Sequence, residues 1–277
     1  MNMISIFERW DGLLYSIYNF VMRLHYIIKR PVIHKIISKN KSMKGIHAGE
    51  HCFVVLNGPS INQFDLSLLK DEVVFATNFF FRAPLCENIN PNYYCWLDSK
   101  RLADPSVVEL VGDIKEACPN AKLLLNYKAY SYLGERQNVN YIYAKHISNY
   151  FSTKIDLSGL CSNFFTVAYF AIASAIYMGF KDIYVLGLDF EPVGFTHFTH
   201  LGNDAVNSMP GKKTEKLEVA GDYWQYAMAQ FQSYSLNEVA KKYNCNIYNL
   251  NPNSYIRAFK FMNGEEIGLK KKEKELS

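Results

Sequence analysis

Short apolar runs alternate with stretches of helical spacing along the middle of the chain. Strands that alternate with helices usually form parallel sheets, so this order predicts an α/β fold, a Rossmann-like, mostly parallel sheet with helices on both faces. The runs expected as strands are residues 51–57, 72–77, 92–97, 121–126, 139–144, 182–188 and 245–250. The stretches expected as helices are residues 61–69, 106–117, 162–178 and 221–243.

Residues 158–180 carry no charged side chain, and their length alone would suit a membrane span. The segment ends at Gly179, however, and an apolar run follows at once at 182–188. A helix, a glycine and then a strand are typical of a buried crossover helix in an α/β domain. We therefore expect this segment to lie in the core of the protein.

The first 50 residues differ from the rest of the chain. Apolar residues within 12–28 recur three, four and seven positions apart, which predicts an amphipathic helical arm. The arm carries eight basic and three acidic side chains. It suits an interfacial helix on an anionic membrane, and equally a helix packed on its own domain or on a second subunit of a homo-oligomer. Glu8 and Asp11 precede the apolar stretch, so no signal peptide is expected.

These patterns divide the chain into three parts. Residues 1–50 form the arm, residues 51–262 form one Rossmann-like domain with a small lid at about 191–226, and residues 263–277 form a charged tail. The sequence predicts a cytoplasmic protein, peripheral on the inner face of the cytoplasmic membrane if the arm binds lipid.

Composition excludes several classes of protein. The chain is 49% hydrophobic and has a net charge of +4, which excludes a disordered chain. The arm accounts for this positive charge, so the body is not basic and no nucleic acid is expected as a partner. The six cysteines form no CxxC pair, which argues against a zinc or redox site and for buried thiols in a reducing compartment.

Polar residues gather where the predicted strands end. In open α/β sheets, ligands bind at the carboxyl ends of the strands, so a nucleotide is expected at this edge. Gly58 would let the backbone approach a ligand, although the same turn could be an ordinary one in which Ser60 caps a helix. Each of the other residues, taken alone, is also typical of turns and caps. The candidates are Asn57, Gly58, Ser60, Asn78, Asp98, Ser99, Asp189, Asn251, Asn253 and Ser254.

His197 and His200 lie in a Thr- and Phe-rich segment beyond the run 182–188. This position suits a general base, whereas a metal pair is poorly supported because no carboxylate or third histidine flanks them. No DxD, GxSxG or HExxH motif occurs, and no metal or cofactor is expected.

Four spaced motifs resemble those of bacterial sialyltransferases of glycosyltransferase family 42 and their lipooligosaccharide, capsule and O-antigen relatives. The resemblance covers roughly residues 51–260. It rests on NGPS at 57–60, Asn78 followed by aromatics, GFKDIYVLGLDF at 179–190 and NCNIYNLNPNSYI at 244–256.

This resemblance implies a GT-A-variant domain with a lid that uses CMP-sialic acid without a metal. It assigns nucleotide contacts to Asn57, Gly58, Ser60 and Asn78, and places Asp189 in the same cleft. The segment 251–254 corresponds to a cytidine-side loop. A polar turn at the start of the long helix, approximately Ser162 and Asn163, also contacts the donor.

The chain departs from that family at its catalytic groups. The positions of the family's phosphate-holding tyrosines fall near Glu191 and His197, and the segment 222–227 lacks the family's lid histidine. The asparagine after the third strand is replaced by Leu97 or Asp98. His197 and His200 are therefore the candidates for the base. The side chains that could face the phosphate are Tyr223, Tyr226, Lys212 and Lys213.

The resulting hypothesis is an inverting, metal-independent sialyltransferase-like enzyme. It would move sialic acid, or a related nonulosonic acid, from a CMP-sugar to a hydroxyl of a glycolipid or surface oligosaccharide. Two alternatives stay open: the same fold with another donor such as CMP-Kdo, and a non-catalytic nucleotide-binding subunit of a polysaccharide assembly complex.

Overall fold

The computed structural model describes residues 3–83, 86–147, 153–190 and 216–270. Its centre is a nine-stranded sheet in which every neighbouring pair of strands is parallel. The strand order is β6-β5-β4-β3-β2-β1-β7-β8-β9. The predicted α/β fold is therefore confirmed. The strands are β1 (His51–Val55), β2 (Val74–Thr77), β3 (Tyr93–Trp96), β4 (Lys122–Asn126), β5 (Val139–Ile147), β6 (Leu160–Asn163), β7 (Asp182–Leu186), β8 (Asn246–Asn249) and β9 (Lys260–Phe261).

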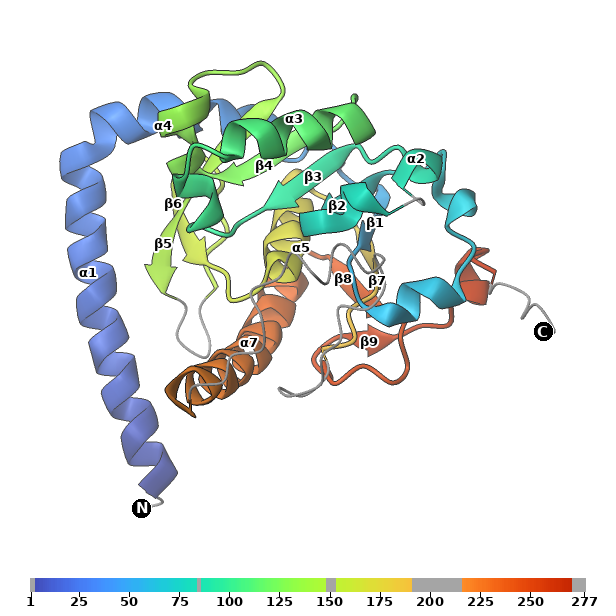
Figure 1. Ribbon diagram of the computed structural model, residues 1–277. Helices are drawn as coiled ribbons and strands as arrows, with labels where there is room; N and C mark the ends of the chain where they lie inside the picture. The colour runs from blue at the N-terminus through green and yellow to red at the C-terminus, as the bar shows by residue number, and fades with distance from the viewer. Residues whose placement is uncertain (1–2, 84–85, 148–152, 191–215, 271–277) are drawn as a thin grey trace.

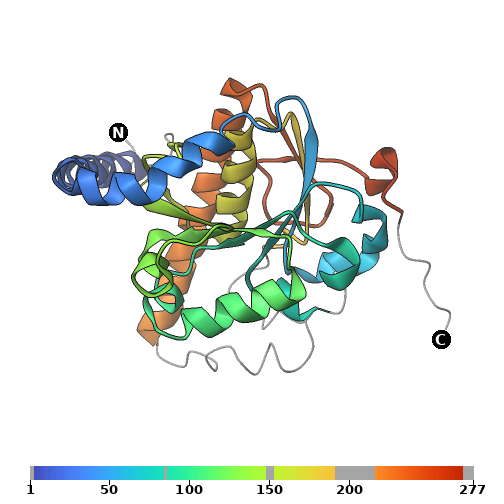
Figure 2. The same cartoon turned by 90° about the horizontal axis from the view of Figure 1, so that it is seen from above.

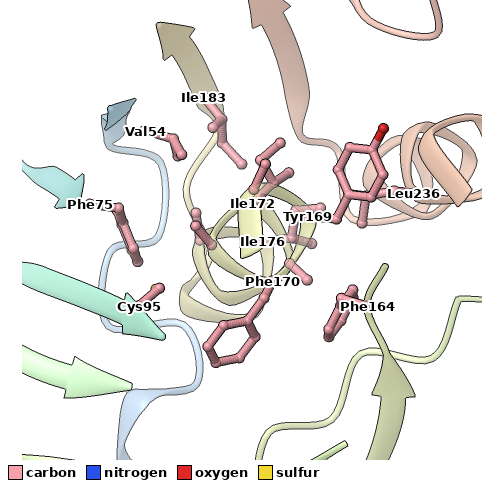
Figure 3. Packing of buried hydrophobic residues seen from close by; sticks show 14 of the residues in the cluster. Val54, Phe75, Cys95, Phe164, Tyr169, Phe170, Ile172, Ile176, Ile183 and Leu236 are labelled. Carbon is pink, nitrogen blue, oxygen red and sulfur yellow. The ribbon is translucent and has the colours of Figure 1, made fainter. Parts of the chain in front are cut away.

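Helices cover both faces of the sheet (Figures 1 and 2). One face packs against α5 and α7, and the other against α3 and the short elements around it. Helix α5 is apolar on every side, and Ile172 and Ile176 meet Val54 of β1 and Phe75 of β2 in the core (Figure 3). The α-helices are α1 (Met3–Ile37), α2 (Cys86–Ile89), α3 (Val107–Ala117), α4 (Tyr130–Leu133), α5 (Val167–Met178) and α7 (Lys216–Lys242).

Helix α5 ends as the sequence predicts. Gly179 adopts φ +92°, a left-handed conformation that favours glycine, and β7 begins three residues later. Eleven of the twelve residues of α5 are buried, so the uncharged segment is a core helix. No helix within the described ranges is long and apolar enough to cross a membrane.

Two expected helices differ from the observed elements. The segment 61–69 forms two short 3-10 helices, Pro59–Gln63 and Leu66–Leu69, because Phe64 and Asp65 between them are extended. The expected helix 162–178 begins as strand β6, and the helix itself starts at Val167. Thr166 ends the extended stretch, because its side chain accepts a hydrogen bond from the Tyr169 backbone N–H and caps α5.

Helix α1 runs along the outside of the molecule beside β5 (Figure 1). Asn19 donates to the Ile147 carbonyl at 2.8 Å and accepts from the Ile147 N–H at 2.7 Å. Further along, Ile33 and Ile37 are buried against Tyr143 and Leu160. The carboxyl-terminal part of the arm is thus built into the core, whereas the opposite side of α1 faces solvent.

Candidate functional site

The strand order reverses beside β1, where β2 lies on one side and β7 on the other. The turn after β1 is tied to β7, because the Gly58 N–H donates to the Gly187 carbonyl at 3.0 Å. A Cβ at position 58 would lie 2.3 Å from that carbonyl oxygen and 2.5 Å from Asp189 Oδ2. A side chain larger than that of glycine would therefore clash, and the groups that approach Gly58 are the Gly187 backbone and the Asp189 carboxylate. The predicted approach of a ligand at Gly58 stays a prediction.

Asp189 joins three segments of the chain at this point. Its carboxylate accepts hydrogen bonds from the Ser60 N–H at 2.9 Å, from the Ser60 hydroxyl, and from the Asn251 amide at 2.6 Å. These three side chains are buried, with exposed fractions of 7%, 6% and 9% respectively. Their polar atoms are therefore hydrogen-bonded to one another. The side chain of Ser60 bonds to Asp189 instead of capping a helix.

The loop after β8 is shaped by its own side chains. Asn249 and Asn251 each accept a hydrogen bond from the backbone N–H two residues ahead, at 3.1 and 2.9 Å. The buried Ser254 hydroxyl donates to the Leu188 carbonyl at 2.5 Å. Asn253 faces solvent. Hydrogen bonds thus attach the loop 251–254, which was predicted to face cytidine, to the segment just after β7.

A cavity of about 440 Å³ opens at the carboxyl edge of the sheet. The segments that follow β2 and β3, the end of β6, the start of α5 and helix α7 all contribute residues to its lining. Four of the candidates from the sequence, Asn78, Asp98, Ser99 and Asn163, lie together in its lining. The remaining lining residues are Leu97, Phe164, Phe165, Thr166, Val167, Trp224 and Gln225.

Two asparagines follow β1 and β2, and one of them, Asn78, lines the cavity. Asn78 adopts φ +49°, in the left-handed region, and its carbonyl accepts from the Tyr94 hydroxyl at 2.6 Å. Asn57 donates to the Thr77 carbonyl at 3.1 Å, and its amide oxygen is buried with no hydrogen-bond partner among the described residues. A buried acceptor without a partner is unusual, which marks Asn57 as a position where a ligand donor could bond.

The long helix α7 supplies parts of the site that sequence reasoning missed. The Gln232 side chain accepts from the Phe165 N–H and donates to the Asn163 carbonyl, both at 2.9 Å, and so fixes the cavity wall between β6 and α5. Trp224 is 52% exposed, and its ring meets Phe165 edge to face at 5.8 Å. No motif surrounds either residue. The available signal is their place on a predicted helix between two candidate segments of the polar rim, Asp189 and residues 251–254.

The other predicted site residues lie elsewhere. Ser162 is fully buried, where its hydroxyl accepts from the Lys154 N–H at 2.7 Å, so it does not open a helix as expected. His197 and His200 lie outside the described residues, as do Glu191, Lys212 and Lys213. Tyr226 is stacked on Phe190 at 4.7 Å, and its hydroxyl donates to the Phe190 carbonyl. In the described ranges, no group of three His, Cys, Asp or Glu side chains is placed to hold a metal ion.

Comparison with solved structures places the fold among glycosyltransferase structures. The MAf glycosyltransferase from Magnetospirillum magneticum AMB-1 is 17% identical, with a TM-score of 0.50, and the match covers 86% of this chain and 40% of that one. Two structures of the sialyltransferase CstII from Campylobacter jejuni, in complex with cytidine-5'-monophosphate and with CMP-3FNeuAc, are also similar. They are 19% and 16% identical, with TM-scores of 0.48 and 0.44, and cover 78% and 77% of this chain and 85% of theirs. At such identities the likeness concerns the fold.

Sequence comparisons give a family. Curated proteins gave no match. The family model described as 6-hydroxymethylpterin diphosphokinase MptE-like matches residues 18–193, which is more than half of the chain and includes β1 to β7. The chain belongs to this MptE-like family.

Proposed function

We propose that the protein is an inverting glycosyltransferase whose donor is a CMP-activated nonulosonic acid such as sialic acid. The observation that carries this proposal is the cavity at the carboxyl edge of the parallel sheet, near the reversal of strand order. Nucleotides bind at this place in open α/β sheets, and the cavity volume of about 440 Å³ suits a ligand of that size.

The lining supports a nucleotide in chemical terms. Trp224 and Phe165 offer aromatic surfaces for a flat base. The amides of Asn78 and Asn163 can donate to and accept from the base edge or the ribose. The first turn of α5 borders the same cavity at Thr166 and Val167, and the amino end of a helix favours a phosphate.

The reaction follows from such a complex. An acceptor hydroxyl oxygen attacks the anomeric carbon, and the bond from that carbon to the phosphate oxygen breaks. The electron pair leaves with CMP. The imidazole of His200 or His197 takes the hydroxyl proton, and backbone N–H groups stabilise the charge of the leaving phosphate. The acceptor is a hydroxyl of a glycolipid or surface oligosaccharide.

In this proposal the buried candidates act as positioning residues. Asp189, Ser60 and Asn251 hold the β1 turn, the β7 end and the loop after β8 in one arrangement. Asn57, Gly58, Asn253 and Ser254 lie in the turns that this arrangement holds, and among them the Asn57 amide oxygen, which has no partner among the described residues, is the group that accepts a hydrogen bond from the donor. Asp98 and Ser99 complete the rim beside Asn78.

A second candidate function comes from the family description. A 6-hydroxymethylpterin diphosphokinase moves a diphosphate from a nucleoside triphosphate to a pterin hydroxymethyl group, releasing the nucleoside monophosphate. Such phosphoryl transfer normally uses Mg²⁺. Both reactions would place a nucleotide at the same edge, so nucleotide preference and metal dependence separate them.

The first experiment measures thermal shifts with CMP, UMP, GDP and ATP, each in the presence of Mg²⁺ and in the presence of EDTA. A stabilising shift with CMP that EDTA leaves unchanged supports the CMP-sugar donor. A shift with ATP that requires Mg²⁺ overturns it in favour of the diphosphokinase.

Trp224→Ala should weaken the binding of the preferred nucleotide about tenfold or more, because the base loses an aromatic surface on which to stack. Tyr234→Ala is the matched control, since Tyr234 is as exposed (53%) on the same helix but does not line the cavity.

The second experiment tests the base. Release of CMP from CMP-sialic acid should fall by about 10²–10⁴ in either His200→Ala or His197→Ala. His51→Ala serves as the control, because His51 is exposed at the start of β1, away from the carboxyl edge. Full activity in both single variants would contradict the assignment. CMP binding without turnover of CMP-sialic acid or CMP-Kdo would favour the non-catalytic subunit.

A further inference from the structure

Helix α1 exposes a wide apolar strip on the side that faces away from the domain. The strip consists of large apolar side chains that are 44–75% exposed. Residues seven apart share one face of a helix, and the strip contains such pairs as Phe20 with Ile27 and Val21 with Ile28. Its members are Leu13, Leu14, Ile17, Phe20, Val21, Leu24, Ile27, Ile28 and Val32.

Opposite the strip, Asn19, Tyr26 and Ile33 are also seven apart and face the domain. The helix is therefore already held by one side, and the apolar strip plays no part in that packing. A continuous apolar surface of this length is typical of a contact with another partner or with a membrane.

Charge limits which partner fits. Residues 12–49 contain no Asp or Glu, whereas they contain seven Lys and Arg. A second copy of α1 would bring basic flanks against basic flanks along the strip, because the only acids of the helix, Glu8 and Asp11, lie at its amino-terminal end, ahead of the strip. An anionic lipid surface supplies the opposite charge and accepts the apolar strip at the same time.

A basic cavity of about 390 Å³ opens beside the strip, between α1 and the segment 154–160. Four cationic side chains line it, Arg23, Arg30, Lys41 and Lys154, against one carboxylate, Asp156. Ser158 already occupies one oxygen of Asp156 with two hydrogen bonds, at 3.1 and 2.9 Å. Among the described residues, none of the four cations is in an ion pair.

Two further observations connect this cavity to a ligand and to the strip. Nδ1 of His34, in the cavity wall, is buried and has no hydrogen-bond partner among the described residues. Ile27 belongs both to the cavity lining and to the exposed strip. The cavity thus opens at the edge of the surface that a membrane would cover.

We propose that α1 lies in the headgroup region of an anionic membrane, with its apolar strip toward the acyl chains, and that the basic cavity binds the phosphate of one lipid headgroup. This inference goes beyond the proposed glycosyl transfer and does not depend on the nucleotide.

The test is co-sedimentation of the full chain with vesicles of phosphatidylcholine alone and of phosphatidylcholine mixed with phosphatidylglycerol. We expect binding to the mixed vesicles only. Phe20→Glu/Ile28→Glu should abolish it, and both residues are exposed (62% and 75%), so the fold should be unaffected. Each basic residue near an anionic surface strengthens binding about fivefold, so Arg30→Gln/Lys154→Gln should weaken it about 25-fold or more.

Two control pairs remove the same charge elsewhere. Lys260 lies on β9, the edge of the sheet away from α1, and Lys270 follows the 3-10 helix Gly264–Ile267, on the opposite side of the molecule from α1 (Figure 1). Lys260→Gln/Lys270→Gln should change binding less than about threefold because salt screens charge over that distance. Lys29→Gln/Lys35→Gln lies on α1 outside the cavity lining. A cavity pair that weakens binding no more than this second pair would overturn the headgroup site.

Other occupants would give different results. Release of the chain from vesicles by millimolar glycerol phosphate or inorganic phosphate would show that the cavity takes a soluble phosphate. A dimer in solution that Phe20→Glu/Ile28→Glu converts to a monomer, with no vesicle binding by the wild type, would assign the strip to a second copy. Because vesicle binding needs no nucleotide, failure here leaves the proposed transferase activity untouched.

Discussion

Gly58 is the residue at which the site leaves least room for change. A methyl group there would meet the Gly187 carbonyl and the Asp189 carboxylate, both fixed by hydrogen bonds. We expect Gly58→Ala to lower the free energy of unfolding by about 1–3 kcal/mol through overpacking, measured by urea denaturation.

Gly112→Ala is the matched control for this substitution. Gly112 lies inside α3, and an added Cβ would meet nothing within 4 Å. Alanine is the better helix former, so this variant should gain about 0.5–1 kcal/mol. Equal effects of the two substitutions would contradict the close approach at Gly58.

Asp189→Asn tests whether the buried carboxylate stabilises the fold by joining three segments of the chain. Each of its oxygens accepts from a donor, and an amide nitrogen cannot accept. At least one buried donor then loses its partner, at a cost of about 1–3 kcal/mol in unfolding free energy. Asp71→Asn, at an exposed position, should be neutral. Unchanged stability in Asp189→Asn, together with lost nucleotide binding, would instead make Asp189 a ligand contact.

For single residues, the sequence predicts where the candidate site residues lie better than it predicts what each of them does. Polar residues directly after strands lie at the carboxyl edge, because parallel strands all end there, and Asn78 and Asp98 indeed line the cavity. Asp189 and Ser60 occupy the same edge but are buried in contact with each other. Trp224 and Gln232 lie on a helix whose docking depends on the whole fold, so no local pattern marks them.

Among the elements, β6 shows where the sequence pattern fails. Its residues Leu160–Asn163 continue into the apolar run of α5 without a charged residue between them, so helical and extended segments look alike. The boundary is set by Thr166 as N-cap and by Gln232 from α7, the second of which is a tertiary contact. Gly179, a local signal, marked the other end correctly.

Strand β5 carries a titratable group that couples stability to pH. Burial lowers the pKa of His146, and the nearby charges of Lys154 and Arg23 lower it further. The unfolded chain therefore binds a proton at a higher pH than the folded one. Stability should fall as the pH drops through the ordinary histidine value of 6.5, until the lower folded-state pKa is passed.

The measurement is the melting temperature between about pH 7.5 and about pH 5.5. His146→Gln should flatten the decrease on acidification, and His51→Gln, at an exposed position, should leave it in place. A decrease of the same slope in His146→Gln would mean that another group carries the effect.

For the whole molecule, the class of fold follows from the alternation of elements, but the order of strands does not. The reversal at β1, which puts β7 beside it, joins segments more than a hundred residues apart. The same holds for α1, whose attachment through Asn19 and Ile33 depends on β5. Sequence periodicity predicted that the arm is amphipathic; the structure adds that the inward face is polar in part and that the apolar strip is left outside.

The reactivity of the cysteines can test whether the sheet and its two helical layers unfold in one cooperative step. All six are buried thiols in no disulfide, and they are spread from β1 to the start of β8. Burial raises the pKa of Cys161 and Cys245 to about 12 and also raises the pKa of Cys52 and Cys95, whereas the hydrogen bond with Cys86 lowers the pKa of Cys118.

We expect no thiol to react with a disulfide reagent in the native protein on the timescale of its reaction with free cysteine. All six should then react in a single phase whose rate follows global unfolding as urea is added, because a thiol in the core is reached only when the sheet opens.

The matched variant is Cys86→Ser/Cys118→Ser, which removes the pair whose sulfur atoms lie 2.9 Å apart. It should lower the amplitude by two thiols without adding or removing a phase. A separate fast phase of two thiols in the wild type, absent from this variant, would mean that the layer around α2 and α3 opens on its own. The sheet and its two helical layers would then not be a single cooperative unit.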